Sequence, residues 1–290
     1  MPHVPKIRVG NYEALWLRDT CFWLDGGTMF NTVPRVLWER KVTPDDQHRI
    51  GIGLNCLLLR GEGRVILVDA GIGDKLPEKQ KRIYRLDPGL TLMGEMAQAL
   101  VVPETVDTVV LTHLHLDHAG WLTRRTADGR LVPTFPNARH VVQRAEWEAA
   151  HTTNELTEGS YRPEDFDLLE QMGLLDLVEG DGPVAPSVTV ALTAGHTPGH
   201  QIVKVESQGM SLVCPSEIVP TSWHLNPAWL MSYDLDPLRL LEVKRELMRR
   251  AAAEHQWVFL GHDPVAAFGR LMPTARRGCY AWQPAEPQTD

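Results

Sequence analysis

The segment Thr-His-Leu-His-Leu-Asp-His-Ala-Gly at residues 112–120 constrains the fold most, because it places four ligand-type side chains within six residues. These side chains are His113, His115, Asp117 and His118. A buried imidazole needs partners for both ring nitrogens, and a buried carboxylate costs still more, so packing explains the cluster poorly. Imidazole and carboxylate groups suit zinc, iron and manganese ions. The spacing therefore predicts a metal site rather than a solvated polar loop.

Two more histidines stand in short glycine-containing segments. His196 lies in Ala-Gly-His-Thr-Pro-Gly-His, and His262 lies in Gly-His-Asp-Pro. Each segment follows a predicted strand, as residues 112–120 do, and loops at strand ends carry the active sites of many α/β proteins. Alone, each is more often a turn histidine than a ligand. Together and in this order, they are expected to join the metal site.

Apolar runs and turn residues predict alternating blocks of strands and helices. Strands are predicted at 13–24, 51–60, 65–68, 108–111, 138–143, 188–192, 201–206, 211–214 and, as the last clear strand, 256–260. Helices are predicted at 93–100, 145–151, 163–171 and 237–253, the last with apolar Leu238, Leu241, Val243 and Leu247. The strands 51–60 and 65–68 form a hairpin. This order predicts an α/β chain with two sheets packed face to face and covered by helices, in one domain over 1–290.

Composition narrows the classes of partner. The formal net charge is −8 and the sequence pI is near 5.8, which argues against nucleic acid or an anionic membrane surface as a partner. No apolar run is long enough to cross a bilayer, and the first residues lack an apolar signal core, so a cytoplasmic location is expected. The four cysteines show no CxxC spacing and predict neither a zinc knuckle nor a disulfide framework.

The succession THLHLDHAG, AGHTPGH, a strand ending near an acidic residue, and GHDP resembles the metallo-β-lactamase superfamily. The resemblance covers about residues 51–264 and is strongest to lactonase-like and phosphotriesterase-like hydrolases, which include the N-acyl homoserine lactonases. It implies an αββα sandwich of two mixed β-sheets flanked by helices. It also implies two divalent metal ions, zinc in the first place, with iron and manganese as alternatives. A homodimer is one assembly that the resemblance implies.

Carried over residue by residue, the resemblance implies two metal sites. The first consists of His113, His115 and His196, and the second of Asp117, His118 and His262. His200 is expected to join the hydrogen bonds of the ligand loop, and His224 either faces the substrate or caps its loop. Neither is expected to bind metal.

Glu217 departs from the family pattern. It stands where a bridging aspartate is expected, and Ser216 stands where a glycine is expected. Glutamate is longer by one methylene, so Glu217 either bridges the ions or binds one of them, unless Asp234 or Asp236 serves instead. Asp69 ends a predicted strand and either orients a ligand histidine or simply forms a turn before Gly71.

The function implied is a dinuclear metal-dependent hydrolase that cleaves an ester-like bond, with a lactone as the leading substrate and a metal-bridging hydroxide as nucleophile. Asp117 is the candidate catalytic residue, because it can pass a proton to the leaving group. Phosphotriesters and aryl esters are further small-molecule candidates. In homoserine lactonases a tyrosine follows the bridging aspartate by three residues; here that position is Pro220, with Tyr233 as a candidate replacement. Candidates for an apolar pocket wall are Trp23, Met29, Phe30, Trp223 and Trp229.

Two other hypotheses keep the same fold. An iron-dependent oxidoreductase is disfavoured by the complete second ligand set and by the lack of a flavodoxin-like segment after the domain. A catalytically weakened protein that binds a ligand and acts on a partner would account for Glu217 and Ser216. The six intact ligand positions argue against that hypothesis.

Overall fold

Two long antiparallel strands form the frame of the molecule. The computed structural model describes residues 4–286. In it the two long strands pair with each other from Tyr12↔Gly61 to Asp25↔Arg49. They belong to a seven-stranded sheet of order β1-β2-β3-β4-β5-β8-β9. Its strands are β1 (Lys6–Val9), β2 (Tyr12–Asp25), β3 (Arg49–Gly61), β4 (Arg64–Val68), β5 (Thr108–Val110), β8 (Arg139–Gln143) and β9 (Leu175–Val178).

A second seven-stranded sheet follows the chain order from β10 to β16. Its strands are β10 (Gly182–Ala185), β11 (Val188–Leu192), β12 (Gln201–Ser207), β13 (Met210–Cys214), β14 (Trp257–Phe259), β15 (Phe268–Pro273) and β16 (Tyr280–Pro284). Both sheets are mixed, since β4, β5, β8 and β9 pair in parallel in the first, and β13 pairs in parallel with β14 in the second. A separate hairpin joins β6 (Thr123–Arg125) to β7 (Leu131–Pro133).

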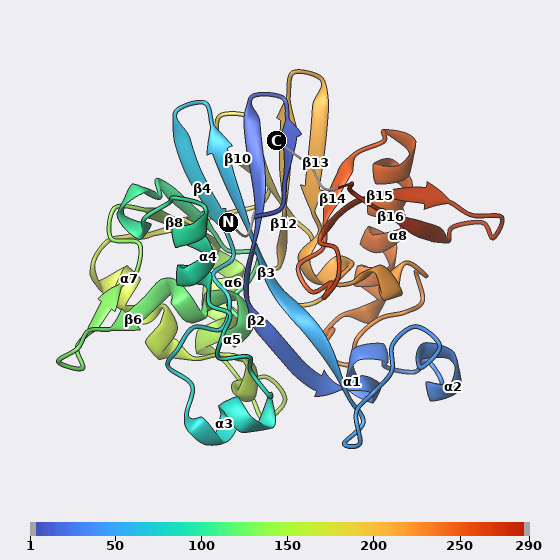
Figure 1. The fold of residues 1–290 in the computed structure, drawn as a ribbon, viewed down its shortest axis with the longest axis horizontal. Coiled ribbons are helices and arrows are strands. Elements are labelled where there is room, and N and C mark those ends of the chain that lie inside the picture. The colour runs from blue at the N-terminus through green and yellow to red at the C-terminus, as the bar shows by residue number, and fades with distance from the viewer. Residues whose placement is uncertain (1–3, 287–290) are drawn as a thin grey trace.

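Helices cover the outer faces of the paired sheets (Figure 1). The α-helices within residues 4–286 are α1 (Gly26–Phe30), α2 (Arg35–Trp38), α3 (Glu78–Ile83), α4 (Leu92–Gln98), α5 (Leu116–Ala119), α6 (Arg144–His151), α7 (Asp167–Gln171) and α8 (Pro237–Ala253). Of these, α1, α2 and α3 lie beyond the strand ends and not over a sheet face (Figure 1). Figure 1 shows α4 to α7 on one side of the strands and α8 on the other. No helix within residues 4–286 is long and apolar enough to cross a membrane.

The side-chain alternation of the strands produces this layering. Val110 and Val141 face the second sheet and share one core with Val203, whereas their neighbours Val109 and Val142 point to the helices outside. Strands buried on both faces tend to be apolar at successive positions, as Val109–Val110 of β5 and Val141–Val142 of β8 are. The predicted αββα sandwich of two mixed sheets is confirmed.

Helix α8 begins and ends where the sequence predicts. The Asp236 side chain accepts a hydrogen bond from Arg239 N at 3.0 Å and caps the helix, and Pro237 occupies its first turn. The core-facing stripe includes the expected Leu247, with Val243 packed against it, and also passes through Leu240 and Met248. Leu238 is 74% exposed and does not contribute to the core.

Two other predictions are wrong in detail. The helix expected at 163–171 is interrupted, because Phe166 has φ −134° and is buried between the 3-10 turn Pro163–Asp165 and α7. The strand at 257–259 is not the last, because β15 and β16 follow it. These two carry Gly269, Pro273 and Pro284 and lie at the edge of the sheet, where a half-exposed strand gives a weak apolar pattern.

The fold brings the predicted loops to one edge of the sandwich. Residues 112–118 follow β5, residues 193–200 connect β11 to β12, Glu217 follows β13, and His262 follows β14. The approach of the backbone is close at Gly120, where an added Cβ would overlap the carbonyl of Ile72. Glycine at this position lets the loop after β4 lie directly against the loop after β5.

His140 makes a pH-dependent contribution to stability. Its ring is buried on β8, and burial lowers its pKa from 6.5 to about 4. Between these two values the unfolded chain binds a proton that the folded chain does not, so stability falls as the pH falls from 6.5 towards 4. We expect His140→Gln to remove about 2 kcal/mol of the stability lost between roughly pH 7.5 and pH 5. Urea unfolding of chelator-treated protein measures this, and an unchanged pH slope in the variant would contradict it.

Candidate metal centre

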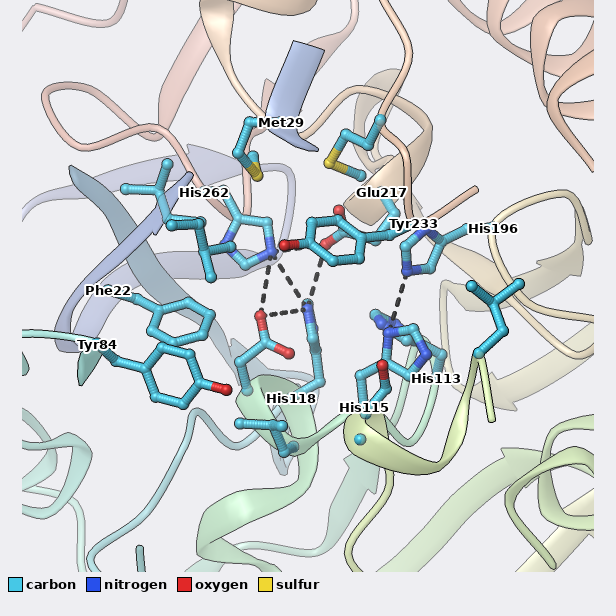
Figure 2. Close-up of a pocket in the computed structure, with 18 residues that line it drawn as sticks. Phe22, Met29, Tyr84, His113, His115, His118, His196, Glu217, Tyr233 and His262 are labelled. Carbon is cyan, nitrogen blue, oxygen red and sulfur yellow. Dashed lines mark hydrogen bonds and ion pairs between the residues drawn. The ribbon is translucent and has the colours of Figure 1, made fainter. Parts of the chain in front are cut away.

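Ligand-type side chains from four loops converge on one cavity (Figure 2). Their nitrogen and oxygen atoms form three groups, and the atoms of each group lie within 4.8 Å of one another. The structure brings together all seven residues singled out in the sequence. The groups are the first trio (His113, His115 and His196), the second trio (Asp117, His118 and His262), and a third made of His113, His118 and Glu217.

The Thr112 hydroxyl fixes the tautomer of His113. Thr112 Oγ1 lies 2.9 Å from Asp69 Oδ2, 2.9 Å from Ser216 Oγ and 3.1 Å from His113 Nδ1. Its single proton goes to the carboxylate, so the hydroxyl accepts from Ser216 and from the Nδ1–H of His113. The lone pair of His113 is therefore on Nε2, which is buried without a hydrogen-bond partner among residues 4–286. A buried nitrogen of this kind suits a metal ion.

Three other histidines are oriented in the same way. In each, Nδ1–H donates to a fixed acceptor and leaves the Nε2 lone pair directed into the centre. The pairs are His118 to Asp69 Oδ2 at 3.0 Å, His196 to Asp234 Oδ1 at 2.8 Å, and His262 to the carbonyl of Gly53 at 2.9 Å.

Two short contacts bring ring nitrogens of the centre together. His118 Nε2 lies 3.2 Å from His262 Nε2, and His196 Nε2 lies 3.1 Å from His115 Nδ1. Two nitrogen lone pairs at this separation repel unless a proton or a cation lies between them. Nitrogens bound about 2.0–2.1 Å from a tetrahedral zinc ion are about 3.3 Å apart, close to both contacts. The donor set therefore fits a divalent cation at each trio.

Glu217 reaches the space between the trios. Its Oε1 lies 2.6 Å from His262 Nε2 and 3.2 Å from His118 Nε2. Neither aspartate considered as a substitute takes this place, because Asp234 accepts from a histidine Nδ1–H and Asp236 caps α8. The Glu217 carboxylate thus contacts two histidines of the second trio and lies within 4.8 Å of His113 of the first.

The turn that carries Glu217 takes a backbone conformation usual for glycine. Ser216 has φ +47°, in the left-handed region that residues with a Cβ rarely adopt. Its hydroxyl donates to Thr112 Oγ1, which ties the turn to the loop after β5. This bond compensates part of the conformational cost of having serine there.

Two aspartates behind the histidines support them. Asp69 accepts from Thr112 N at 2.8 Å and from His118, and its φ of +59° also makes it the turn residue after β4. Both functions considered for Asp69 are therefore present in one residue. The orienting contact of Asp234 with His196 was not predicted, and no local sequence signal separates Asp234 from Asp236.

Burial and neighbouring charges set the ionisation of the centre. Burial is the largest influence on His113 and His115 and lowers the pKa of both well below the ordinary value, which keeps both imidazoles neutral. Burial favours the neutral acid of Glu217, but His262 and His118 outweigh it and hold the pKa of the carboxyl well below its usual range. Burial also favours the neutral rings of His118, His196 and His262, but the neighbouring carboxylates outweigh it and raise the pKa of each imidazole. Cations bind neutral imidazoles and ionised carboxylates, so a cation that binds here displaces protons from these three rings.

Asp117 is the ligand-type residue most open to the cavity. It lies in the first turn of α5, and its side chain keeps 16% of its surface exposed. Its Oδ2 lies 3.7 Å from His118 Nε2 and 3.8 Å from His262 Nε2. The carboxylate can therefore reach both the second trio and a molecule in the cavity.

The two remaining histidines of this region support the loops, as predicted. His200 is buried; its Nδ1 lies 2.7 Å from Thr193 Oγ1, and its Nε2 accepts from Glu217 N at 3.3 Å. His224 is also buried, and its Nε2–H donates to the carbonyl of Met29 at 2.8 Å. His224 thus holds the loop after β13 against α1, behind the cavity.

The cavity above the centre measures about 300 Å³ and has mainly apolar walls. Its apolar and aromatic lining consists of Phe22, Leu24, Met29, Ile52, Tyr84, Leu116, Leu156, Met231 and Tyr233. Of the five predicted wall residues, Met29 lines the cavity. Trp23 does not, because successive residues of β2 point to opposite faces and Phe22 and Leu24 take the cavity side. Phe30, Trp223 and Trp229 form an aromatic cluster outside the lining.

Comparison with known proteins agrees with this geometry. Residues 51–262 match the family model of the metallo-beta-lactamase superfamily, which is more than half of the chain. The chain belongs to this superfamily. The matched segment contains every residue of both trios and Glu217.

This superfamily member is similar to several named proteins. It is 35% identical over 178 residues to the N-acyl homoserine lactonase AttM of Azorhizobium caulinodans, covering 57% of this chain and 60% of that protein. It is 30% identical over 224 residues to an N-acyl homoserine lactonase of a Bacillus species, covering 72% of this chain and 80% of the relative. A probable metal-dependent hydrolase from Staphylococcus aureus superposes with TM-score 0.88 at 27% identity, covering 98% of this chain and 100% of that structure.

Removal of the Glu217 charge tests its place in the centre. We expect Glu217→Gln to weaken the binding of one of two zinc ions by about tenfold or more, because the variant loses the carboxylate nearest to His262 Nε2. Competition titration with a chromophoric chelator measures the affinity of each ion. Glu206→Gln, an exposed carboxylate on β12, serves as the control and should bind both ions as the wild type does. Wild-type affinities in both variants would contradict a ligand role for Glu217.

Proposed function

We propose that the protein is a dinuclear metal-dependent hydrolase that opens uncharged lactones. The observation that carries the proposal is the convergence of fixed imidazole lone pairs and two carboxylates on the floor of an apolar cavity. The names of two relatives, both N-acyl homoserine lactonases, favour a lactone as substrate. The proposed metal-binding residues are His113, His115, Asp117, His118, His196, Glu217 and His262.

The charge of the cavity supports an uncharged substrate. Within the described chain, its lining includes no lysine or arginine, and its fixed charges are the carboxylates of Asp117 and Glu217. A phosphate or a substrate carboxylate would therefore meet no cationic side chain outside the metal centre. Apolar walls with a few directed polar groups instead suit a lactone with an acyl chain.

The residues of this chain have separate parts in the reaction. When bound, a pair of divalent cations lowers the pKa of water towards neutrality and polarises a carbonyl oxygen. Asp117 faces the cavity beside the second trio, where its carboxylate can take a proton and return it to the ring oxygen that leaves when the lactone opens. The apolar walls exclude bulk water and hold the ring over the centre.

Tyr233 places a hydroxyl in the cavity. This placement supports Tyr233 as the replacement for the tyrosine of homoserine lactonases, whose position is occupied by Pro220 in this chain. Figure 2 shows its ring over the centre, near Glu217 and His262. Its hydroxyl lies 3.0 Å from Thr28 Oγ1, and burial raises its pKa, so the phenol keeps its proton. Thr28 Oγ1 donates its own proton to the Asp25 carbonyl at 2.8 Å, so the phenol donates to Thr28 in this structure. When a substrate is bound, the phenol can turn this proton to a carbonyl oxygen of the substrate.

Loss of ligand residues tests the reaction. We expect Asp117→Asn to lower kcat for N-hexanoyl homoserine lactone by about 10²–10⁴-fold, the usual contribution of a proton-transfer group. His115→Ala should abolish turnover because the first trio loses a donor. Proton release in a weakly buffered assay measures both, and the melting temperature of the chelator-treated variants confirms folding. Wild-type turnover in either variant would contradict the assignment. A wild type that cleaves aryl esters or phosphotriesters but no lactone would refute the substrate class.

The Tyr233 hydroxyl has a test of its own. We expect Tyr233→Phe to lower kcat/KM for the same lactone by about tenfold, the effect of one lost hydrogen bond. Thr28→Val is the matched control, because it removes the partner of the phenol and leaves the phenol itself. Equal losses in the two variants would show that the Thr28 contact, rather than donation to substrate, accounts for the effect.

A further inference from the structure

We propose that Glu146 is a positioning residue that fixes the geometry of the first trio and leaves the second trio unaffected. The inference rests on the proposed metal centre. It concerns a residue that contacts no candidate ligand atom and acts through the backbone and side chains beside the three histidines.

The Glu146 carboxylate joins the two loops that carry the first trio. It lies on α6 and is buried. Its Oε1 accepts from Leu114 N at 2.9 Å, and Leu114 is the residue between His113 and His115. Its Oε2 accepts from Thr197 Oγ1 at 2.5 Å, and Thr197 follows His196. One carboxylate therefore holds the neighbours of all three histidines at fixed separation.

A third bond extends the contact to the His115 ring. Tyr161 donates its hydroxyl to Glu146 Oε1 at 3.2 Å. The Tyr161 ring packs edge-on against the His115 ring with centroids 4.9 Å apart, and the two residues also form an isolated β-bridge. Glu146 thus limits the rotation of His115, the one histidine of the centre that presents Nδ1 to its neighbour.

The backbone is shaped for this contact. An added Cβ at Gly199 would overlap the backbone of Glu146, so only glycine lets the loop after β11 approach α6 this closely. A buried carboxylate is costly when its donors are neutral, as the three donors named here are. An apolar side chain would anchor α6 at lower cost. The free-energy cost of burying the Glu146 carboxylate is offset if its charge and its three hydrogen bonds stabilise a cation bound by the first trio.

The second trio has a different support. Asp69 accepts from His118 Nδ1–H, and Gly53 O accepts from His262. Within the described chain, the Glu146 side chain makes no hydrogen bond to these residues and bonds to Leu114, Tyr161 and Thr197 instead. A change at Glu146 should therefore affect one cation only, which a general loss of stability would not produce. Asp69 supports His118 directly and also reaches His113 through Thr112, so a change at Asp69 should affect the second trio as well as the first.

The test uses two backgrounds that each keep one complete trio. In His262→Ala the first trio is complete, and in His196→Ala the second is complete. We expect Glu146→Gln to weaken zinc binding by about 10–100-fold in the His262→Ala background and by less than about twofold in the His196→Ala background. Asp69→Asn should weaken binding in the His196→Ala background by a similar factor. Glu148→Gln, an exposed carboxylate on α6, is the matched control and should have no effect in either.

The readouts are competition titration with zinc and the visible spectrum of the cobalt-substituted proteins, which reports coordination independently of turnover. Thr197→Val, which removes one of the three bonds, should weaken the same ion by a smaller factor and serves if Glu146→Gln does not fold. Equal weakening in both backgrounds, or none in either, would overturn the inference. Selective weakening in a protein that opens no lactone would refute the proposed substrate and leave the role of Glu146 standing. A wild type that binds no zinc would end both.

Discussion

The centre depends on hydrogen bonds that decide which nitrogen of each histidine carries its proton. Asp69 and Asp234 take the Nδ1–H groups of His118 and His196, and the Gly53 carbonyl takes that of His262. These acceptors direct the Nε2 atoms of His118 and His262 to within 3.2 Å of each other, where two lone pairs repel unless a proton or a cation lies between them. A bound cation replaces this repulsion with attraction, because each nitrogen then donates its lone pair to the positive charge. The buried carboxylates behind the ring of histidines are therefore part of the ligand set in energetic terms.

The sandwich makes this arrangement rigid. The loops that carry the ligands begin at strands whose side chains are buried on both faces, such as β5 with Val109 outside and Val110 between the sheets. A strand held on both sides cannot slide by one residue without turning its apolar side chains the wrong way. The first residues of each loop therefore start from a fixed point, and the distances between loops follow from the pairing of the strands.

Local patterns in the sequence predict much of the fold and of the metal centre. The bounds of α8, most central strands and the convergence of His113, His115 and His118 with two distant histidines follow from spacing and apolar runs. The sequence did not predict edge strands such as β16, because a half-exposed strand with proline has no clear alternation of apolar and polar residues. Glu146 lies 32 residues from Leu114 along the chain, and nothing near it marks it, because its role comes from the tertiary packing of α6. The sequence analysis predicted Met29 as a wall residue. It did not predict Phe22, because that requires knowing which face of β2 points to the cavity.

The origin of the cavity walls has an evolutionary consequence. Phe22, Leu24 and Met29 precede residue 51, where the match to the superfamily model begins, whereas the ligand residues all lie inside it. Three of the nine apolar and aromatic wall residues thus lie outside the matched segment, and the other six lie inside it with the ligand residues. Substitutions before residue 51 can therefore reshape one wall of the cavity while every ligand residue stays unchanged. Homologous proteins can differ in substrate selectivity in this way and keep the same metal centre.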